Sequence, residues 1–310
     1  MTIRPPSFLL AHAAFFVAAA LMALAPAQAE RILFVGNSFT FGAGSPVRSF
    51  HPELVHDLNR EGIGGVPALF RTFATEMGLD WEVSLETSPG KDLAWHLANR
   101  RAELTGAWDV VVLQDHSTLD PAHPGDPTAH VRDSATMAAL FKAGNPAARI
   151  LLETTWPRAD LTYPPRGRWA GKPIRAMADD LARANALALL NSRQLNGTIP
   201  VGQAWLRAMD SGLADPNPYD GVAFGKIDLW TWDHYHASAA GYYLAALTIF
   251  GRVTGIDPRT LGPRERAADE LGFNPATTAA LQRIAAETLA AADGSASKDV
   301  ACARRSVTTC

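Results

Sequence analysis

The chain has 310 residues and a formal net charge of −3 at neutral pH. This length is enough for one α/β domain with a substantial buried core. Because no stretch of Lys and Arg forms a basic patch, we do not expect nucleic acid as a partner.

The N-terminal segment has the pattern of a removable export signal. Arg4 precedes an almost wholly apolar stretch from Phe8 to Leu24, and Ala27-Gln28-Ala29 matches a small-x-small cleavage site. The apolar stretch of about 17 residues is at the lower limit for crossing a bilayer, so an uncleaved membrane anchor is the alternative. We predict a signal peptide over residues 1–29 and a periplasmic or secreted protein. No later segment is long and apolar enough to cross a membrane, so no stable membrane association is expected after cleavage.

Short apolar runs alternate with helical patterns along the rest of the chain. We expect strands at Arg31–Val35, Trp81–Glu86, Asp109–Gln114, Arg149–Thr154 and Thr198–Val201. We expect helices at Val66–Met77, Asp92–Arg101, Val131–Ala143, Pro173–Ser192, Gly202–Ser211, Ser238–Thr254 and Pro275–Ala292. Strands that alternate with helices predict βαβ units, a parallel sheet and right-handed crossovers.

Three stretches between these elements are irregular. Phe41–Gly65 is a long connection for an α/β unit, and such loops often form lids or walls of a site. Asp120–Thr128 and Arg158–Gly171 are rich in Pro and Gly and follow the third and fourth strands. Loops that follow parallel strands lie on one edge of the sheet, so these segments could build one shared pocket.

The domain limits follow from the same patterns. Residues 30–292 are expected to form a single domain, and the small, polar residues 293–310 to form a disordered tail. The tail holds the two cysteines, Cys302 and Cys310, which could close a disulfide in an oxidising compartment or stay unpaired.

A serine follows the first predicted strand directly. The strand ends at Gly36, and the segment continues Asn37-Ser38-Phe39-Thr40. Open α/β sheets place their chemistry at the carboxyl ends of strands, where Ser38 would be presented. Serine in such a turn is also a common helix cap, which is the structural alternative.

An acid and a histidine occur near the other end of the chain, in Asp233-His234-Tyr235-His236. Asp233 and His236 are about one helical turn apart, so the carboxylate can bind one imidazole nitrogen while the other faces the serine. Together with Gly36-Asn37-Ser38-Phe39-Thr40, this block resembles the SGNH or GDSL-like hydrolases, with Asn37 in place of the aspartate of the usual first motif. The resemblance implies a three-layer α/β/α sandwich with a five-stranded parallel sheet in flavodoxin-like order. It assigns Ser38 as nucleophile, His236 as base and Asp233 as the acid that orients it.

The resemblance also implies donors for an oxyanion. The Ser38 backbone N–H is one, and Gly90, in the loop after the second strand, matches a glycine that the family uses as another. The family's third motif, Gly-x-Asn-Asp, has no clear counterpart in Gln114-Asp115-His116-Ser117. Depending on the register, Gln114 or Ser117 would supply the third donor.

Two rival interpretations remain open. Asp233, His234 and His236, with His116 or Asp115, could bind zinc or iron and make a metal-dependent hydrolase, although no H-x-x-x-H or H-E-x-x-H pattern supports it. Alternatively, the missing third motif would fit a catalytically silent carbohydrate-binding protein on the same fold.

The sequence therefore predicts an exported serine hydrolase that cleaves ester bonds through an acyl-enzyme and needs no cofactor or metal. Its partner would be a small-molecule or glycan ester. Six aromatic residues surround the candidate motifs and favour O-acetyl esters of carbohydrates among the substrates that fit: Trp95, Trp156, Trp169, Trp230, Trp232 and Tyr235.

Overall fold

The computed structural model describes residues 29–306 of the chain. The predicted signal peptide (apart from Ala29) and the pairing of Cys302 with Cys310 lie outside what it describes, and both stay predictions. Within residues 29–306, no helix combines the length and the apolar character needed to cross a membrane.

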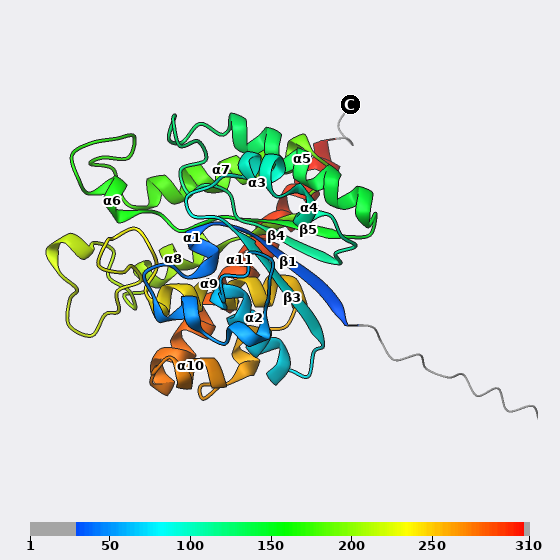
Figure 1. Ribbon diagram of the computed structural model, residues 1–310. Coiled ribbons are helices and arrows are strands. Elements are labelled where there is room, and N and C mark those ends of the chain that lie inside the picture. Colours follow the sequence, from blue (N-terminus) through cyan, green and yellow to red (C-terminus); the bar gives the residue numbers. More distant parts are fainter. Residues whose placement is uncertain (1–28, 307–310) are drawn as a thin grey trace, which may run out of the picture.

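The centre of the molecule is a parallel sheet with the strand order β2-β3-β1-β4-β5-β6 (Figure 1). Its strands are β1 (Glu30–Gly36), β2 (His56–Asp57), β3 (Trp81–Thr87), β4 (Val110–Leu113), β5 (Arg149–Glu153) and β6 (Gly197–Ile199). Without β2, the order of the five longer strands is flavodoxin-like, as expected. The α/β fold class is thus confirmed.

The expected number of five strands is wrong by one. β2 has only two residues, and it pairs with Ser84 and Leu85 of β3 at the edge of the sheet. Two polar residues carry no alternating apolar pattern, so the sequence does not predict this strand. It becomes a strand only through its pairing with β3. The predicted loop 41–65 thus contains this strand and two short 3-10 helices, Pro46–Ser49 and Pro52–Leu54.

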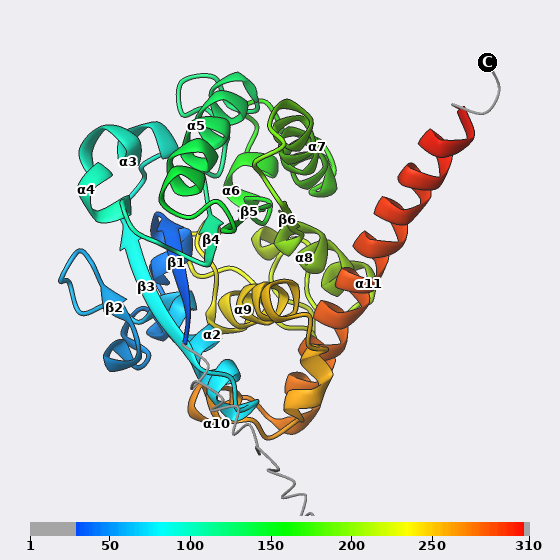
Figure 2. The same cartoon turned by 90° about the vertical axis from the view of Figure 1, so that its right-hand side faces the viewer.

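Helices cover both faces of the sheet, which gives the expected three layers (Figures 1 and 2). They are α1 (Ser38–Phe41), α2 (Gly65–Glu76), α3 (Leu93–Asn99), α4 (Arg101–Leu104), α5 (Thr128–Gly144), α6 (Ala159–Thr162), α7 (Arg175–Asn191), α8 (Val201–Asp210), α9 (Ala239–Thr254), α10 (Arg266–Glu270) and α11 (Pro275–Ser306). The expected helix Asp92–Arg101 is divided into α3 and α4 at Arg100. α11 continues to Ser306, past its expected end at Ala292, and the disordered tail stays a prediction.

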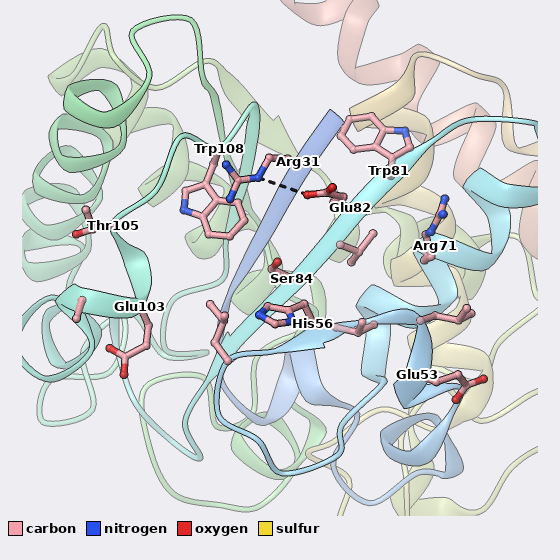
Figure 3. A pocket seen from close by; sticks show the side chains of 15 residues that line it. Arg31, Glu53, His56, Arg71, Trp81, Glu82, Ser84, Glu103, Thr105 and Trp108 are labelled. Carbon is pink, nitrogen blue, oxygen red and sulfur yellow. Dashed lines mark ion pairs between the residues drawn. The ribbon is translucent and has the colours of Figure 1, made fainter. Parts of the chain in front are cut away.

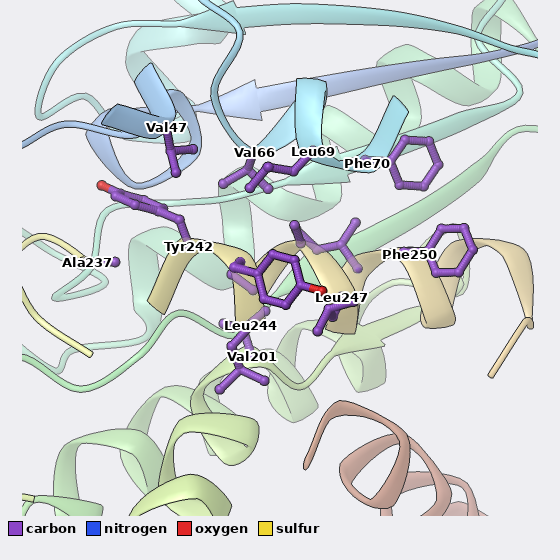
Figure 4. Close-up of a cluster of buried hydrophobic side chains, with 14 of the residues drawn as sticks. Val47, Val66, Leu69, Phe70, Val201, Ala237, Tyr242, Leu244, Leu247 and Phe250 are labelled. Carbon is purple, nitrogen blue, oxygen red and sulfur yellow. The ribbon is translucent and has the colours of Figure 1, made fainter. Parts of the chain in front are cut away.

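Successive residues of β1 pack against different layers because side chains alternate along a strand. Ile32 and Phe34 belong to the core beneath α2, α8 and α9, part of which Figure 4 shows. Leu33 and Val35 pack on the other face, with α3, α4 and α5. A strand buried on both faces is a continuous apolar run, and each fully buried large aliphatic side chain stabilises the fold by about 1.5–3 kcal/mol.

The central strand β1 has β3 on one side and β4 on the other. The chain runs first to one side of β1 and then to the other, so the carboxyl ends of β1 and β4 flank the topological switch point of the sheet. Ligands of open α/β sheets bind at such a point. It is here that the sequence places Ser38, after β1, and the Gln114–Ser117 segment, after β4.

Candidate active site

Ser38 is the first residue of α1, which begins directly after β1 and the capping residue Asn37. Asn37 Oδ1 accepts a hydrogen bond of 3.2 Å from the backbone N–H of Phe39. A short polar side chain is suited to this position because it satisfies an N–H that has no partner within the helix. Asn37 therefore caps the turn, and Ser38 itself is 6% exposed.

Gly36 is needed because other side chains pack against it closely. A Cβ atom there would lie 2.3 Å from Thr40 Oγ1 and 2.6 Å from Gln114 Oε1. Gln114 Oε1 accepts hydrogen bonds from the Asn37 backbone N–H at 2.9 Å and from Thr40 Oγ1 at 3.0 Å. This side chain, which comes from the end of β4, fixes the turn that carries Ser38.

The predicted donor role of Gln114 is limited by these contacts. Its Oε1 faces the turn, and its Nε2 donates to the backbone carbonyl of Asp115. Both partners fix the orientation of the amide, since an N–H must meet Oε1 and a carbonyl must meet Nε2. Only the second hydrogen of Nε2 is left for an oxyanion.

His236 and Asp233 form the pair that the spacing predicts. His236 Nδ1 donates to Asp233 Oδ2 at 2.7 Å. Asp233 Oδ1 accepts from Thr231 Oγ1 and from the backbone N–H groups of Tyr235 and His236. Burial opposes ionisation of Asp233, but these hydrogen bonds outweigh it and lower its pKa to about 2. A fixed carboxylate therefore holds the imidazole.

The other nitrogen of His236 is free to take a proton. Within residues 29–306, His236 Nε2 is buried and has no hydrogen-bond partner. A buried polar atom without a partner is rare and needs an explanation. With the proton on Nδ1, Nε2 carries the lone pair that a general base uses.

The structure brings the segments of Ser38 and His236 together. The ring of Phe39, the residue after Ser38, lies edge-on to the His236 ring with centroids 5.9 Å apart. A Cβ atom placed on Gly44, just after α1, would lie 3.8 Å from His236 Cβ. No hydrogen bond between Ser38 Oγ and His236 Nε2 is found among the described residues; such bonds often form fully only when substrate is bound.

Tyr242 of α9 is a further part of this arrangement, which the sequence reasoning missed. The single hydrogen of its hydroxyl is shared between the backbone carbonyl oxygens of Ser38 and Ala43, each 3.1 Å from the hydroxyl oxygen. The contact connects α1, which begins with Ser38, to α9, the helix that follows His236. No signal in the sequence pairs an α9 tyrosine with a backbone carbonyl so distant along the chain.

The loop after β3, which contains Gly90, lies beside the turn that carries Ser38. Ser88 N donates to Gly36 O at 3.1 Å, and Asn37 Nδ2 donates to Lys91 O at 2.9 Å. Gly90 has φ +66°, and nothing lies within 4 Å of its Cβ position. Glycine is thus favoured by a left-handed backbone at an exposed turn next to Asn37.

The loop after β4 is held by Asp115. One carboxylate oxygen accepts from the backbone N–H of Leu93 at 3.0 Å, and the other pairs with His130 Nδ1 of α5 at 2.8 Å. Burial alone would raise the pKa of Asp115, but its hydrogen bond and charge interaction with His130 lower it. Ser117, two residues on, is 2% exposed and accepts a hydrogen bond of 3.3 Å from Arg158 Nη1.

Comparison with solved structures identifies the fold of this chain. No model of a known protein family matches the chain, and no curated protein matches it. A DUF4886 family protein from Bacteroides uniformis superposes with a TM-score of 0.53 at 15% identity, covering 84% of this chain and 95% of that one. A protein named as a GDSL-like lipase from Parabacteroides merdae gives 0.51 at 18% identity, covering 73% of this chain and 95% of the other. The chain has an SGNH-hydrolase fold.

The residues named for the alternative metal site contact other side chains in the structure. Asp233 binds His236, Asp115 binds His130, and the His234 ring packs against Tyr219 at a centroid distance of 4.4 Å. Among the residues that the structure describes, no three His, Cys, Asp or Glu side chains are grouped so that they could hold a metal ion.

The aromatic residues near the motifs divide into core and surface groups. Trp156 is fully buried and stacks on Phe39 with ring centroids 4.0 Å apart, so it supports the nucleophile helix. Trp169 and Trp230 are also buried, whereas Trp232, next to Asp233, is 83% exposed. Trp232 presents its ring to solvent, where a ligand could reach it, whereas Trp95 and Tyr235 are half-buried.

Glu153, at the end of β5, is a second feature that the sequence reasoning missed. It lines a cavity of about 10 Å³ together with Asp115, His116 and His130. Burial raises its pKa to about 8. A single acidic residue at the end of an apolar strand gives no sequence signal of this burial.

A cavity of about 810 Å³ lies away from this site. It lies along the outer edge of β3, where Figure 3 shows Trp81, Glu82 and Ser84 beside His56 and Trp108. None of the six predicted site residues lines it. The hydrogen-bonded residues at the switch point therefore lie outside this cavity.

Proposed function

We propose that this protein is a serine hydrolase that cleaves ester bonds. The observation that carries the proposal is the Asp233–His236 pair, whose unpartnered Nε2 lies in the segment packed against the Ser38 helix. A fixed carboxylate, a neutral imidazole and a buried hydroxyl are the groups that nucleophilic ester cleavage requires.

In this mechanism Ser38 Oγ attacks the ester carbonyl carbon while His236 Nε2 takes the hydroxyl proton. Asp233 stabilises the imidazolium that forms. The tetrahedral intermediate then collapses: the bond to the leaving oxygen breaks, and His236 returns the proton to the departing alcohol. Water, activated by the same histidine, hydrolyses the acyl-enzyme and restores Ser38.

The negative oxygen of the intermediate needs donors. Within the described part of the chain, the Ser38 backbone N–H has no acceptor, which leaves it available. Gly90 lies in the neighbouring turn, and Ser117 and Gln114 lie in the loop after β4. Each well-placed donor contributes about 2.7–4 kcal/mol to transition-state stabilisation.

We propose esters of carbohydrates as the substrate class. Trp232, Tyr219 and Phe224 are exposed and precede Asp233 in the chain, and exposed aromatic faces suit sugar rings. Export to the periplasm or outside the cell, proposed from the pattern of residues 1–29, would bring the protein to such polymers. Acetate release from acetylated oligosaccharides, compared with hydrolysis of simple acyl esters, tests the substrate class.

Ser38→Ala tests the function directly. Ser192→Ala is the control, because Ser192 precedes β6 and so lies toward the amino ends of the strands, whereas Ser38 follows the carboxyl end of β1. Turnover of p-nitrophenyl acetate should fall by at least about 10³-fold in the first variant and remain unchanged in the second. A Ser38→Ala protein that is folded and as active as the wild type would refute the proposal. Wild-type protein that binds glycans but shows no turnover would favour the silent carbohydrate-binding alternative.

A further inference from the structure

Arg158, in the loop after β5, connects two parts of the site. Its Nη1 donates to Ser117 Oγ at 3.3 Å. Its guanidinium carbon lies 3.6 Å from the centre of the Tyr235 ring, and that ring is 4.0 Å from the His236 ring. The arginine therefore joins the loop after β4 to the loop that carries the catalytic histidine.

Asp160 fixes the orientation of this arginine. Arg158 Nε and Nη2 donate to the two oxygens of Asp160 at 3.0 and 2.6 Å. A two-point contact with a carboxylate holds the planar guanidinium in one direction. Asp160 in turn donates its backbone N–H to the carbonyl of His234 at 3.2 Å. The third donor, Nη1, is thus left pointing at Ser117.

The contact determines what the Ser117 hydroxyl can do. Arginine has only donors, so Ser117 Oγ must be the acceptor and keeps its own hydrogen. Among the hydrogen bonds of residues 29–306, Ser117 Oγ donates to no acceptor. Ser117 is 2% exposed. A buried hydroxyl hydrogen without an acceptor is costly, and it would be satisfied by an oxygen that arrives with the substrate.

We propose that Ser117 donates its hydroxyl hydrogen to the carbonyl oxygen of the ester as negative charge develops there, and that Arg158 is the positioning residue that orients and polarises it. This inference rests on the proposed ester hydrolysis. A hydrogen bond accepted from a cation makes the hydroxyl a stronger donor. The pair would replace the asparagine that the third SGNH motif supplies. The proton stays on Ser117 throughout, since the contact stabilises charge and transfers nothing.

A double-mutant cycle on p-nitrophenyl acetate hydrolysis tests this role. Ser117→Ala should lower kcat by about 10²-fold or more with KM unchanged, as expected for a donor that acts in the transition state. Arg158→Met should lower kcat by about 10-fold when Ser117 is present but have little effect in the Ser117→Ala background. Arg158→Lys, which keeps a cation, should recover part of the loss.

Arg168→Met is a matched control, because Arg168 also pairs with an aspartate, Asp180, and lies over a tryptophan, Trp169. It should leave kcat unchanged. Thermal unfolding establishes that each variant is folded, and if Arg158→Met is not, the comparison of Arg158→Lys with Arg158→Gln replaces it. Labelling of Ser38 by a fluorophosphonate should persist in every variant, more slowly in the Ser117 and Arg158 variants and at the wild-type rate in Arg168→Met.

The outcomes separate the two proposals. Equal losses from Arg158→Met with and without the Ser117 hydroxyl, a change in KM alone, or full activity of Ser117→Ala would overturn the positioning role while leaving the hydrolase intact. Wild-type protein without turnover and without labelling at Ser38 would overturn both.

Discussion

Gln114 Oε1 accepts a 2.9 Å hydrogen bond from the backbone N–H of Asn37, the residue that caps the Ser38 helix. The contact joins the carboxyl end of β4 to the turn that follows β1. Because these strands are neighbours in a parallel sheet, their carboxyl ends meet at one edge, and a side chain from one can fix the loop of the other. The position of the nucleophile therefore depends on a residue far away in the sequence.

Gln114→Met should weaken both the fold and the reaction. The substitution keeps the length of the side chain but leaves the buried N–H of Asn37 without an acceptor, which costs about 1–3 kcal/mol. Displacement of the turn by about 1 Å would lower kcat by as much as about 10²-fold. Urea unfolding and steady-state kinetics measure the two effects, with the exposed Gln194→Met as control. Unchanged stability and turnover would contradict the role given to Gln114.

Asp233→Asn should leave the protein folded but nearly inactive. An asparagine keeps one oxygen for the hydrogen bonds that Asp233 Oδ1 accepts, but its NH₂ group would face His236 Nδ1. The ring would then carry its proton on Nε2 and could not act as a base, so kcat should fall by about 10³–10⁴-fold. The exposed Asp210→Asn is the control. If Asp233→Asn kept most of the wild-type kcat, the pair would not be catalytic.

Gly36→Ala should destabilise the nucleophile turn. The new methyl group would overlap Thr40 Oγ1 and Gln114 Oε1, and overpacking of this kind costs about 1–3 kcal/mol. Gly294→Ala has the opposite expectation, because nothing surrounds that position in α11 and alanine favours a helix by about 0.5–1 kcal/mol. Thermal melts of the two variants should therefore shift in opposite directions. A Gly36→Ala protein as stable as the wild type would show that the close approach is absent.

Glu153→Gln should change how stability depends on pH. In the folded protein burial raises the pKa of Glu153 to about 8 from its ordinary value of 4.5. The folded state therefore binds a proton that the unfolded state releases, and the wild type loses stability as the pH rises from about 4.5 to about 8. The neutral glutamine avoids this loss, so at pH 9 the variant should be more stable, on the order of a few kcal/mol.

Denaturant unfolding at pH 4.5 and pH 9 measures this difference, with the exposed Glu82→Gln as control. Equal pH profiles of the wild type and Glu153→Gln would mean that Glu153 ionises normally.

Much of the fold was predictable because buried parallel strands are continuous apolar runs. The short run Ile32–Val35, which ends at a glycine, favours a strand. Its limits in the structure, Glu30–Gly36, differ by a single residue at each end from those expected. β2 was not predictable, because His56 and Asp57 carry no apolar pattern and become a strand only by pairing with β3. Local propensity does not contain that information.

Some residues of the candidate site could likewise be predicted from the sequence, and others could not. Ser38, Asp233 and His236 could be proposed from the sequence because each lies in a short motif whose spacing reflects local geometry. Tyr242 and Arg158 were missed, because their contacts depend on how α9 and the loop after β5 pack in three dimensions. Gln114 was found as a polar residue at a strand end, but its contact with Asn37 could be seen only in the structure.

Reaction with a fluorophosphonate probe, followed by mass spectrometry of the peptides, measures most directly whether Ser38 is an activated nucleophile. The account predicts one adduct per chain, on the peptide that contains Ser38, with none in Ser38→Ala and a strongly slowed reaction in His236→Gln. An unmodified wild-type protein, or an adduct on another residue, would contradict it.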